Sequence, residues 1–247
     1  TLRSVLAQTR EDFEVLVVDD GSTDRTASRV EEIAGDTRVH LLRQANAGVA
    51  AARNAGIAAA RGRYVSFLDS DDLWLPGYLE TMGAALDTRP DAGLAFTDAW
   101  VWDEGAGRFG RETIMVTGNP PAIVPDDPRE LLALLIAGNF VYTSATVRRS
   151  VLAEVGGFNG DVSPAEDWEF WLRIVARGHR AIRPAAVLAV YRDRGASLSS
   201  DQGALRAAAK RVLETAAAEY GLDEELLSRV RQRLAEIDAT PTSPAVA

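Results

Sequence analysis

The chain has no cysteine among its 247 residues and only two histidines. The absence of cysteine excludes disulfides, thiolate metal sites and a cysteine nucleophile, and it is consistent with a reducing compartment. Neither His40 nor His179 stands beside a serine nucleophile motif, and G-x-S-x-G is absent, which argues against serine-hydrolase chemistry. The G-x-x-x-x-G-K-[ST] loop of P-loop nucleotide hydrolases is absent as well.

Long apolar runs and an excess of positive charge are also lacking. No run approaches the roughly 18 residues of a membrane span, and no signal peptide is recognisable. The 36 acidic and 27 basic residues leave a net charge of −9, which argues against nonspecific nucleic-acid binding. An anionic ligand would therefore need a metal or local hydrogen-bond donors. We expect a cytoplasmic protein without a nucleic-acid partner, compatible with peripheral contact at the inner face of the membrane.

The first 68 residues alternate between apolar strands and helices. The run at 15–18 is continuous and β-branched, as in a parallel strand buried on both faces. Further strands are predicted at 39–42 and 64–68, with helices from 22 or 23 to 34 and over 49–60. This β-α-β-α-β order predicts a mostly parallel, Rossmann-like sheet flanked by helices. Ligands of such sheets bind outside the carboxyl ends of the strands.

The remaining residues predict further elements and a division into parts. We expect one main domain over 1–200, with a nucleotide-binding part at 1–100 and an acceptor or catalytic part at 101–200. Two C-terminal helices at 201–240 and a disordered tail at 241–247 follow. The predicted elements after residue 75 are helices at 76–86, 129–137, 149–155, 164–177, 205–220 and 222–237, and strands at 94–102, 113–117, 141–147 and 181–190.

Two clusters of carboxylates lie at strand ends. Asp69, Asp71 and Asp72 directly follow the strand at 64–68, and Asp19-Asp20 ends the first strand. Like charges so close repel one another unless a cation or several donors offset them. Oxygen-only ligands on a short loop suit Mg²⁺ or Mn²⁺, which commonly hold substrate phosphates as well. The alternative is that these residues are turn and helix-cap acids.

A third acidic pair, Glu166-Asp167, stands at the predicted start of a helix. A capping box from Ser163 to Glu166 accounts for Glu166 but does not require Asp167. Free N–H groups at a helix start stabilise a carboxylate and should lower its pKa, and an ionised carboxylate can act as a general base. Of the aromatic residues that follow, we expect Trp171 in the core and leave the place of Trp168 open.

Five motifs in order resemble those of the family 2 glycosyltransferases, which have the GT-A fold. The resemblance covers residues 1 to about 200, and each motif is weak without the others. The motifs are V-V-D-D-G-S-T-D (17–24), N-A-G-V-A-A-A-R-N-A-G (46–56), Y-V-S-F-L-D-S-D-D (64–72), E-V-G-G-F (154–158) and E-D-W-E-F-W-L-R (166–173).

The resemblance implies roles for the matching residues. Asp69-Ser70-Asp71 matches the D-x-D element, with Asp71 as the direct metal ligand and Asp69 facing the metal or the ribose. Asp167 matches the catalytic base, beside Glu166. Arg53 could meet a phosphate or pair with a strand-end aspartate. The residues that match the nucleotide-sugar site are Asp19, Asp20, Asn46, Gly48, Arg53, Asn54, Asp69 and Arg194.

Two departures from the family pattern stand out. Leu2, Val5 and Leu6 have helical spacing, and the strand and turn that usually precede this helix are absent from these residues. We therefore expect the chain, taken alone, to be marginally folded, with part of the nucleotide pocket missing. Arg194 occupies a position that is often histidine in the family; arginine cannot ligate a metal but can pair with phosphate oxygens.

The resemblance implies an inverting transfer of a sugar from a nucleotide donor, a UDP-sugar, to an acceptor hydroxyl. The expected cofactor is Mn²⁺ or Mg²⁺, and the expected acceptor is a glycan, a lipid-linked sugar or another hydroxyl compound. Two alternatives stay open at this point. One is a sugar-1-phosphate nucleotidyltransferase, in which Glu166-Asp167 would have no obvious role. The other is a non-catalytic module that binds a sugar nucleotide.

Overall fold

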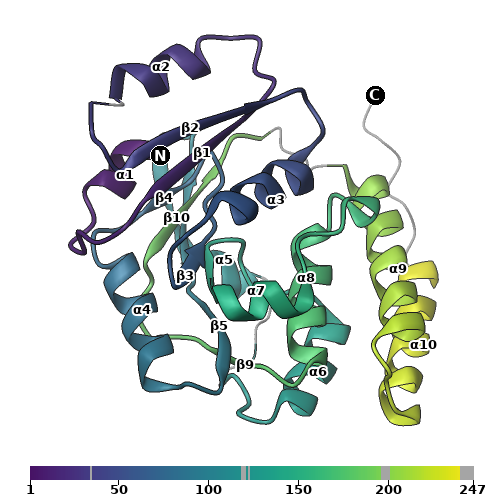
Figure 1. Ribbon diagram of the computed structural model, residues 1–247. Helices are drawn as coiled ribbons and strands as arrows, with labels where there is room; N and C mark the ends of the chain where they lie inside the picture. The colour runs from purple at the N-terminus through teal and green to yellow at the C-terminus, as the bar shows by residue number, and fades with distance from the viewer. Residues whose placement is uncertain (34, 118–120, 122, 196–200, 240–247) are drawn as a thin grey trace.

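The computed structural model describes the chain except residues 34, 118–120, 122, 196–200 and 240–247 (Figure 1). The tail at 241–247, predicted to be disordered, lies outside the described residues. So do part of the run at 118–128, which holds four of the ten prolines and is predicted to be a loop, and residues 196–200 after Arg194. The helices are α1 (Leu2–Leu6), α2 (Thr26–Ile33), α3 (Val49–Ala59), α4 (Tyr78–Thr88), α5 (Ile114–Thr117), α6 (Pro128–Ala137), α7 (Arg149–Val155), the 3₁₀ turn η1 (Gly160–Val162), α8 (Glu166–Ala176), α9 (Gln202–Glu219) and α10 (Glu224–Ala239).

The strands of the described residues form three sheets. One contains β1 and β2, a second has the order β3-β8-β5-β9, and a third has the order β4-β10-β6-β7. The strands are β1 (Val15–Asp20), β2 (Val39–Gln44), β3 (Tyr64–Ser66), β4 (Leu73–Trp74), β5 (Ala92–Phe96), β6 (Ala99–Asp103), β7 (Arg108–Thr113), β8 (Ala145–Arg148), β9 (Arg180–Ile182) and β10 (Ala189–Asp193).

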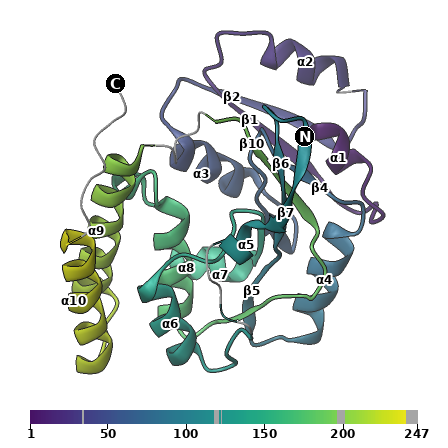
Figure 2. The ribbon, with the colours of Figure 1, turned by 180° about the vertical axis from the view of Figure 1, so that it is seen from behind.

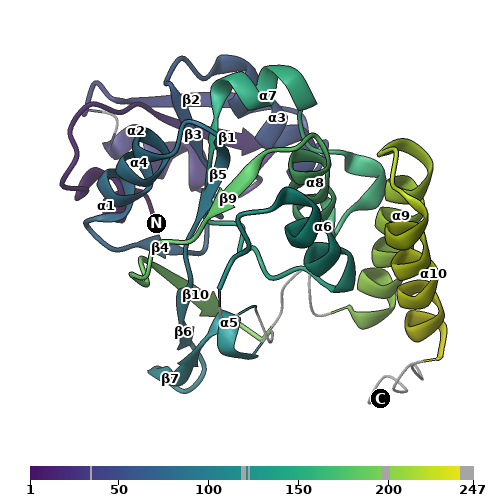
Figure 3. The same cartoon turned by 90° about the horizontal axis from the view of Figure 1, so that it is seen from below.

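The α/β class is confirmed, but the sheets are mixed rather than mostly parallel. Parallel pairing joins β1 to β2, β5 to β9 and β6 to β10. The antiparallel pairs are β3 with β8, β5 with β8, β4 with β10, and β6 with β7. Residues 104–107 connect β6 to β7 directly, and so short a connection permits only an antiparallel pair. Figure 3 shows this hairpin extending away from α6 and α8.

The first three strands do not form one continuous sheet. Register pairs join β1 to β2 and β3 to β8, and within the described residues no strand pairs with the other edge of β1 or β3. Both strands line the same cavity, with a volume of about 1570 Å³. The residues of β1 are consequently half-buried for the most part, and the predicted burial on both faces is wrong.

Several predicted strands are shorter than the apolar pattern suggested. The strand at 94–102 is divided into β5 and β6 at Asp98, whose carboxylate accepts from the Ala99 N–H at 2.7 Å and the Met115 N–H at 3.1 Å. The predicted strand at 113–117 is mostly α5, the strand at 141–147 begins only at Ala145, and 181–190 is divided into β9 and β10. Local turns therefore interrupt apolar runs that the sequence alone could not divide.

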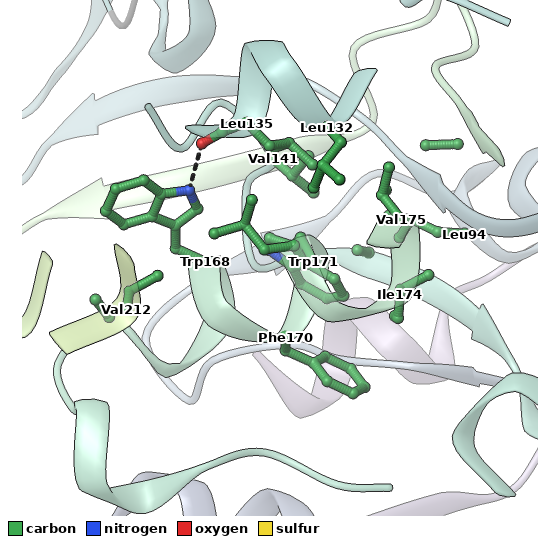
Figure 4. Close-up of a cluster of buried hydrophobic side chains, with 14 of the residues drawn as sticks. Leu94, Leu132, Leu135, Val141, Trp168, Phe170, Trp171, Ile174, Val175 and Val212 are labelled. Atoms are coloured by element: carbon green, nitrogen blue, oxygen red, sulfur yellow. Dashed lines mark hydrogen bonds between the residues drawn. The ribbon is translucent and has the colours of Figure 1, made fainter. Parts of the chain in front are cut away.

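The largest hydrophobic core is built around α8, between β5, α6 and α9 (Figure 4). Trp171 is fully buried there, as predicted, and Trp168 lies in the same core. The Trp168 indole N–H donates to the Leu135 carbonyl oxygen at 2.7 Å, so its polar atom is satisfied inside the core. This packing fixes the first turn of α8, which carries Glu166 and Asp167.

The two C-terminal helices lie side by side against α6 and α8 (Figures 1 and 2). Ala208, Val212 and Leu213 of α9 belong to the same buried cluster as Trp168. On the surface, the Arg129 guanidinium pairs with Asp223 at 2.8 Å and with Glu225 at 2.7 Å. The helices thus complete the core behind α8 instead of forming a core of their own.

Candidate active site

The large cavity brings together acidic residues that are far apart in the sequence. Asp69 and Asp71 come from the loop that follows β3, and Glu166 and Asp167 come from the first turn of α8. All four line the cavity, together with residues of β1, α3 and α4. The end of strand β3 and the start of helix α8 therefore face one space large enough for a substrate.

Arg53 on α3 connects the two acidic groups. Its Nη2 donates to Asp69 Oδ1 at 2.8 Å and its Nη1 donates to Glu166 Oε1 at 2.8 Å. The side chain is 12% exposed, and its guanidinium carbon lies 5.1 Å from the centroid of the Phe158 ring. A buried cation at this point offsets the repulsion between the carboxylates. Of the two roles left open for Arg53, the structure has the pairing with a strand-end aspartate.

The Asp167 carboxylate has one hydrogen-bond donor at each oxygen, with a second, longer contact at Oδ2. The Trp168 N–H donates to Oδ1 at 2.7 Å, the Asn139 amide donates to Oδ2 at 3.2 Å, and the Thr143 hydroxyl lies 3.5 Å from Oδ2. Desolvation by the surrounding protein raises the pKa of Asp167 to about 6, against the lowering influence of Arg53. The predicted lowering is wrong, because desolvation outweighs the stabilisation offered by the helix start.

The predicted capping box at Ser163–Glu166 is also wrong. Helix α8 begins at Glu166, its N-cap is Ala165, and no side chain caps it. The Glu166 carboxylate, 7% exposed, therefore does not turn back to cap the helix and pairs with Arg53 instead. The tertiary contact with α3 replaced the local contact that the sequence favoured.

Asp72 has a structural function that the sequence did not indicate. It is buried, and it accepts from the Tyr142 hydroxyl and from the Arg192 N–H at 3.0 Å. The Arg192 guanidinium also donates to the Asp71 carbonyl oxygen. Burial raises the pKa of Asp72 to about 6. Asp72 therefore ties the loop after β3 to β10, and for this residue neither metal binding nor a simple turn or helix cap describes its contacts.

The Asp69 and Asp71 carboxylates differ in how free they are to bind a metal. Arg53 holds one oxygen of Asp69, while the Asp71 carboxylate forms no ion pair or hydrogen bond within the described part of the chain. No group of three or more histidine, cysteine, aspartate or glutamate side chains there could hold a metal ion by itself. One or two carboxylates nevertheless suffice when substrate phosphates complete the coordination of Mg²⁺. Asp71 fits that arrangement better than Asp69.

Asp19 and Asp20 are absent from the lining of the cavity, and their carboxylates are engaged by other groups of the protein. Asp19 is buried and accepts from the Ser22 N–H at 2.8 Å. Asp20 accepts from the Gln44 side chain at 2.7 Å and from two backbone N–H groups, those of residues 47 and 48, at 2.9 and 2.8 Å. These bonds lower the pKa of both carboxyl groups. Asp20 thus fixes the loop before α3, and the predicted contact of the pair with a nucleotide stays a prediction.

Asn54 and Gly157 explain why two of the motifs belong together. The Asn54 amide donates to the Phe158 carbonyl oxygen at 2.9 Å and accepts from the Phe158 N–H at 2.7 Å. A Cβ atom at Gly157 would lie 2.1 Å from Asn54 Oδ1, so only glycine fits there. Both polar groups of the Asn54 side chain are thus hydrogen-bonded to the Phe158 backbone. Its predicted place beside the donor gains no support from this geometry.

Three other predicted residues lie at the surface. Asn46 and Gly48 are exposed in the loop before α3, where Gly48 has a φ of 88°. Arg194 is exposed just after β10 and is absent from the lining of the cavity. The structure does not bring these three residues to the acidic cluster, and their predicted contacts with the donor remain predictions.

Four residues that line the cavity were missed by sequence reasoning. Asn139, Tyr142 and Thr143 come from the segment that was assigned partly to a strand, and Arg192 comes from β10. The polar residues in the run G-N-F-V-Y-T-S at 138–144 were the only available signal. That run contacts both Asp167 and Asp72, and it forms the wall between them.

Comparison with known proteins decides the family. A sequence profile described as glycosyl transferase family 2 matches residues 1–156, more than half of the chain. The chain belongs to glycosyl transferase family 2. It is 26% identical over 205 residues to WfaP of Escherichia coli, named a UDP-Glc:alpha-D-GlcNAc-diphosphoundecaprenol beta-1,3-glucosyltransferase, covering 82% of this chain and 74% of that protein. It covers only 13% of the length of Rickettsia relatives that it matches over 79 residues.

Solved structures of this family-2 chain's relatives have the same fold. TarS 1–349 of S. aureus in complex with UDP-GlcNAc matches with a TM-score of 0.70 and 20% identity, covering 96% of this chain and 66% of that one. The mannosyltransferase PcManGT of Pyrobaculum calidifontis, in complex with GDP-Man and Mn²⁺, matches with a TM-score of 0.63 and 21% identity, covering 99% and 72%. The GT-A fold is therefore confirmed.

Over the residues that the structure describes, none of the helices combines the length and the apolar character that crossing a membrane requires.

Proposed function

We propose that this family 2 chain transfers a sugar from a nucleotide sugar, a UDP-sugar, to an acceptor hydroxyl with inversion. The observation that carries the proposal is Asp167, a carboxylate with a pKa of about 6 on the wall that it shares with Asp69 and Asp71. A base with this pKa is ionised at neutral pH and still basic enough to accept a proton as a bond forms.

The proposed step is a single displacement. The acceptor oxygen bonds to the anomeric carbon while the bond from that carbon to the diphosphate oxygen breaks. Asp167 takes the acceptor proton, and the nucleoside diphosphate leaves with the electron pair. Asn139 and Thr143 hold Asp167 Oδ2 at 3.2 and 3.5 Å, which orients the carboxylate during this step.

Asp71, with Asp69 beside it, would hold a divalent cation, Mn²⁺ or Mg²⁺. Such a cation supplies Lewis-acid stabilisation of the departing diphosphate. The free Asp71 carboxylate supports this assignment, and Mn²⁺ is present in the complex of PcManGT. Asp69 accepts from Arg53 through one carboxylate oxygen. Its other oxygen is proposed to be the second ligand of the cation or to bind the ribose.

The donor and acceptor classes are proposed from the relatives. WfaP is named for UDP-Glc and a lipid-linked acceptor, and TarS was solved with UDP-GlcNAc. A UDP-sugar and a glycan or lipid-linked hydroxyl are therefore the substrates to test first. Nothing in the family match favours the nucleotidyltransferase or the non-catalytic alternative, and neither gives Asp167 a function.

The experiment combines a donor screen with calorimetry. Wild type should release nucleoside diphosphate from one of UDP-glucose, UDP-GlcNAc and GDP-mannose in the presence of Mn²⁺ and acceptor. Asp167→Asn should lose turnover but keep the affinity for UDP with Mn²⁺, while Asp71→Asn should lose the metal-dependent part of that affinity. The exposed Asp161→Asn serves as the control with an equal loss of charge. Unchanged metal-dependent binding in Asp71→Asn would reject the metal assignment, and full turnover in Asp167→Asn would reject the base.

A further inference from the structure

One oxygen of Glu166 is buried without a hydrogen-bond partner. Among the described residues, three buried side-chain atoms have no partner: Glu166 Oε2, Trp171 Nε1 and Arg233 Nε. Of these three residues, only Glu166 lines the large cavity. An unsatisfied acceptor is costly when buried, so a buried polar atom beside a cavity calls for a ligand that satisfies it.

The position of this oxygen is fixed by its neighbours. Glu166 Oε1 is held by Arg53 at 2.8 Å, and Arg53 is itself held by Asp69 at 2.8 Å and by the Phe158 ring. The carboxylate therefore cannot turn its second oxygen away without losing a charge-assisted bond. Because a carboxylate oxygen only accepts hydrogen bonds, the missing partner must be a donor.

The surrounding charges decide which kind of donor fits. Asp69 and Asp167 lie near Glu166, so a phosphate oxygen would be repelled there. A metal ion bridging Glu166 and Asp69 is disfavoured as well, because the Arg53 guanidinium already lies between these two carboxylates and donates to both at 2.8 Å. A neutral O–H group remains, and sugars are rich in such groups.

We propose that Glu166 Oε2 accepts a hydrogen bond from a hydroxyl group of the sugar that is transferred. Arg53 ties Glu166 to Asp69, on the loop where the nucleotide is proposed to bind, and Asp167, the next residue in the chain, is held by Asn139 and Thr143. Glu166 thus lies beside both the donor loop and the base, and it selects donors that carry a hydroxyl at that position. This inference rests on the proposed function.

The test compares hydroxyl and deoxy donors in two proteins. Calorimetry with Mn²⁺ would measure the affinity of wild type and Glu166→Gln for UDP, UDP-glucose and its 2-, 3-, 4- and 6-deoxy analogues. In wild type, one analogue should bind about 10-fold or more weakly than UDP-glucose, because a bond to a charged acceptor is lost. In Glu166→Gln, the difference in affinity between UDP-glucose and the same analogue should fall to about threefold or less, because a hydrogen bond to a neutral acceptor is weaker than one to a carboxylate.

UDP without a sugar separates recognition of the sugar from a structural effect. Its affinity should agree within about twofold in the two proteins. The matched control is Glu169→Gln, on the same helix: Glu169 is equally buried, but its oxygens are already bound by Arg173 and Tyr220, and it does not line the cavity. Glu169→Gln should keep the discrimination between UDP-glucose and the deoxy analogue.

The outcomes that overturn the inference are distinct from failure of the proposed function. Three results would each overturn it. Wild type and Glu166→Gln could discriminate equally between UDP-glucose and the deoxy analogue, or wild type could bind both with the same affinity. In the third result, Glu166→Gln loses affinity for UDP and for UDP-glucose by the same factor. In the last case, Glu166 acts on the nucleotide loop through Arg53. If wild type binds neither UDP nor UDP-glucose, the proposed function falls and this inference falls with it.

Discussion

Removing the guanidinium of Arg53 tests how the acidic cavity is held together. In Arg53→Met, a side chain of similar length can still cover the Phe158 ring, but Asp69 and Glu166 lose their cation. Removing one partner of a buried ion pair costs about 3–5 kcal/mol, whereas an exposed pair contributes little. Arg61→Met is the matched control, because Arg61 pairs with a glutamate at 3.0 Å but is 76% exposed.

The loss of stability should depend on pH with a definite sign. Desolvation raises the pKa of Asp167 from 3.8 to about 6, and Arg53 is the largest influence that opposes the rise. A carboxyl group with a raised folded-state pKa keeps its proton in the folded state, so stability falls as the pH rises from the unfolded to the folded pKa. In wild type this window ends near pH 6. Without Arg53 the window extends above pH 6, and the deficit of the variant is therefore larger at pH 8 than at pH 5.

Urea unfolding followed by tryptophan fluorescence at pH 5 and pH 8 measures both effects. We expect Arg53→Met to lose about 3–5 kcal/mol at pH 8 and less at pH 5. The Arg61→Met control should change little at either pH. A loss below about 1 kcal/mol for Arg53→Met, equal at the two pH values, would refute the view that this arginine holds the two acidic groups together.

Three further predictions concern the base, a motif and the open strand edges. The kcat/KM of wild type should rise with pH through about 6 as Asp167 loses its proton, and a profile that is flat from pH 5 to 8 would exclude Asp167 as the base. Gly157→Ala should lose about 1–3 kcal/mol through its clash with Asn54, whereas Gly138→Ala, with nothing within 4 Å of the added carbon, should lose little; equal urea midpoints would contradict this. The edges of β1 and β3 that no described strand pairs with predict a thermal midpoint below about 45 °C, and a cooperative melt above it with clear stabilisation by UDP and Mn²⁺ would contradict a marginal fold.

Local chemistry predicted those features that need no partner from elsewhere in the chain. The predicted helices at 129–137 and 149–155 match α6 and α7, since Asp127 caps α6 by accepting from the Arg129 N–H and Gly156 is the C-cap of α7. The sequence also predicts acidic residues at the ends of β1 and β3, because each apolar run that forms a strand is followed directly by aspartates. The five ordered motifs were sufficient to predict the family and the GT-A fold.

Tertiary contacts decided which of these acids belong to the site. The sequence treats Asp19-Asp20 and Asp69–Asp72 alike, but only the second group lines the cavity, because hydrogen bonds engage the first: Asp19 binds the nearby Ser22 N–H, and Asp20 binds groups at residues 44, 47 and 48. At Glu166 the sequence predicts a local cap, but the distant Arg53 binds its carboxylate. The difference is physical: a nearby N–H group is visible in the sequence, whereas burial and a partner on another helix are not.

The sequence by itself determined the α/β class, the family and the presence of carboxylates suited to metal and proton chemistry. Only the tertiary structure decided the pKa of Asp167, since desolvation depends on everything packed around it and outweighs the helix start. The tertiary structure also decided the function of Asp72 as a tie to β10 and the role of Arg53 as the common cation. These properties arise from distances between segments, and the order of residues along the chain does not fix those distances.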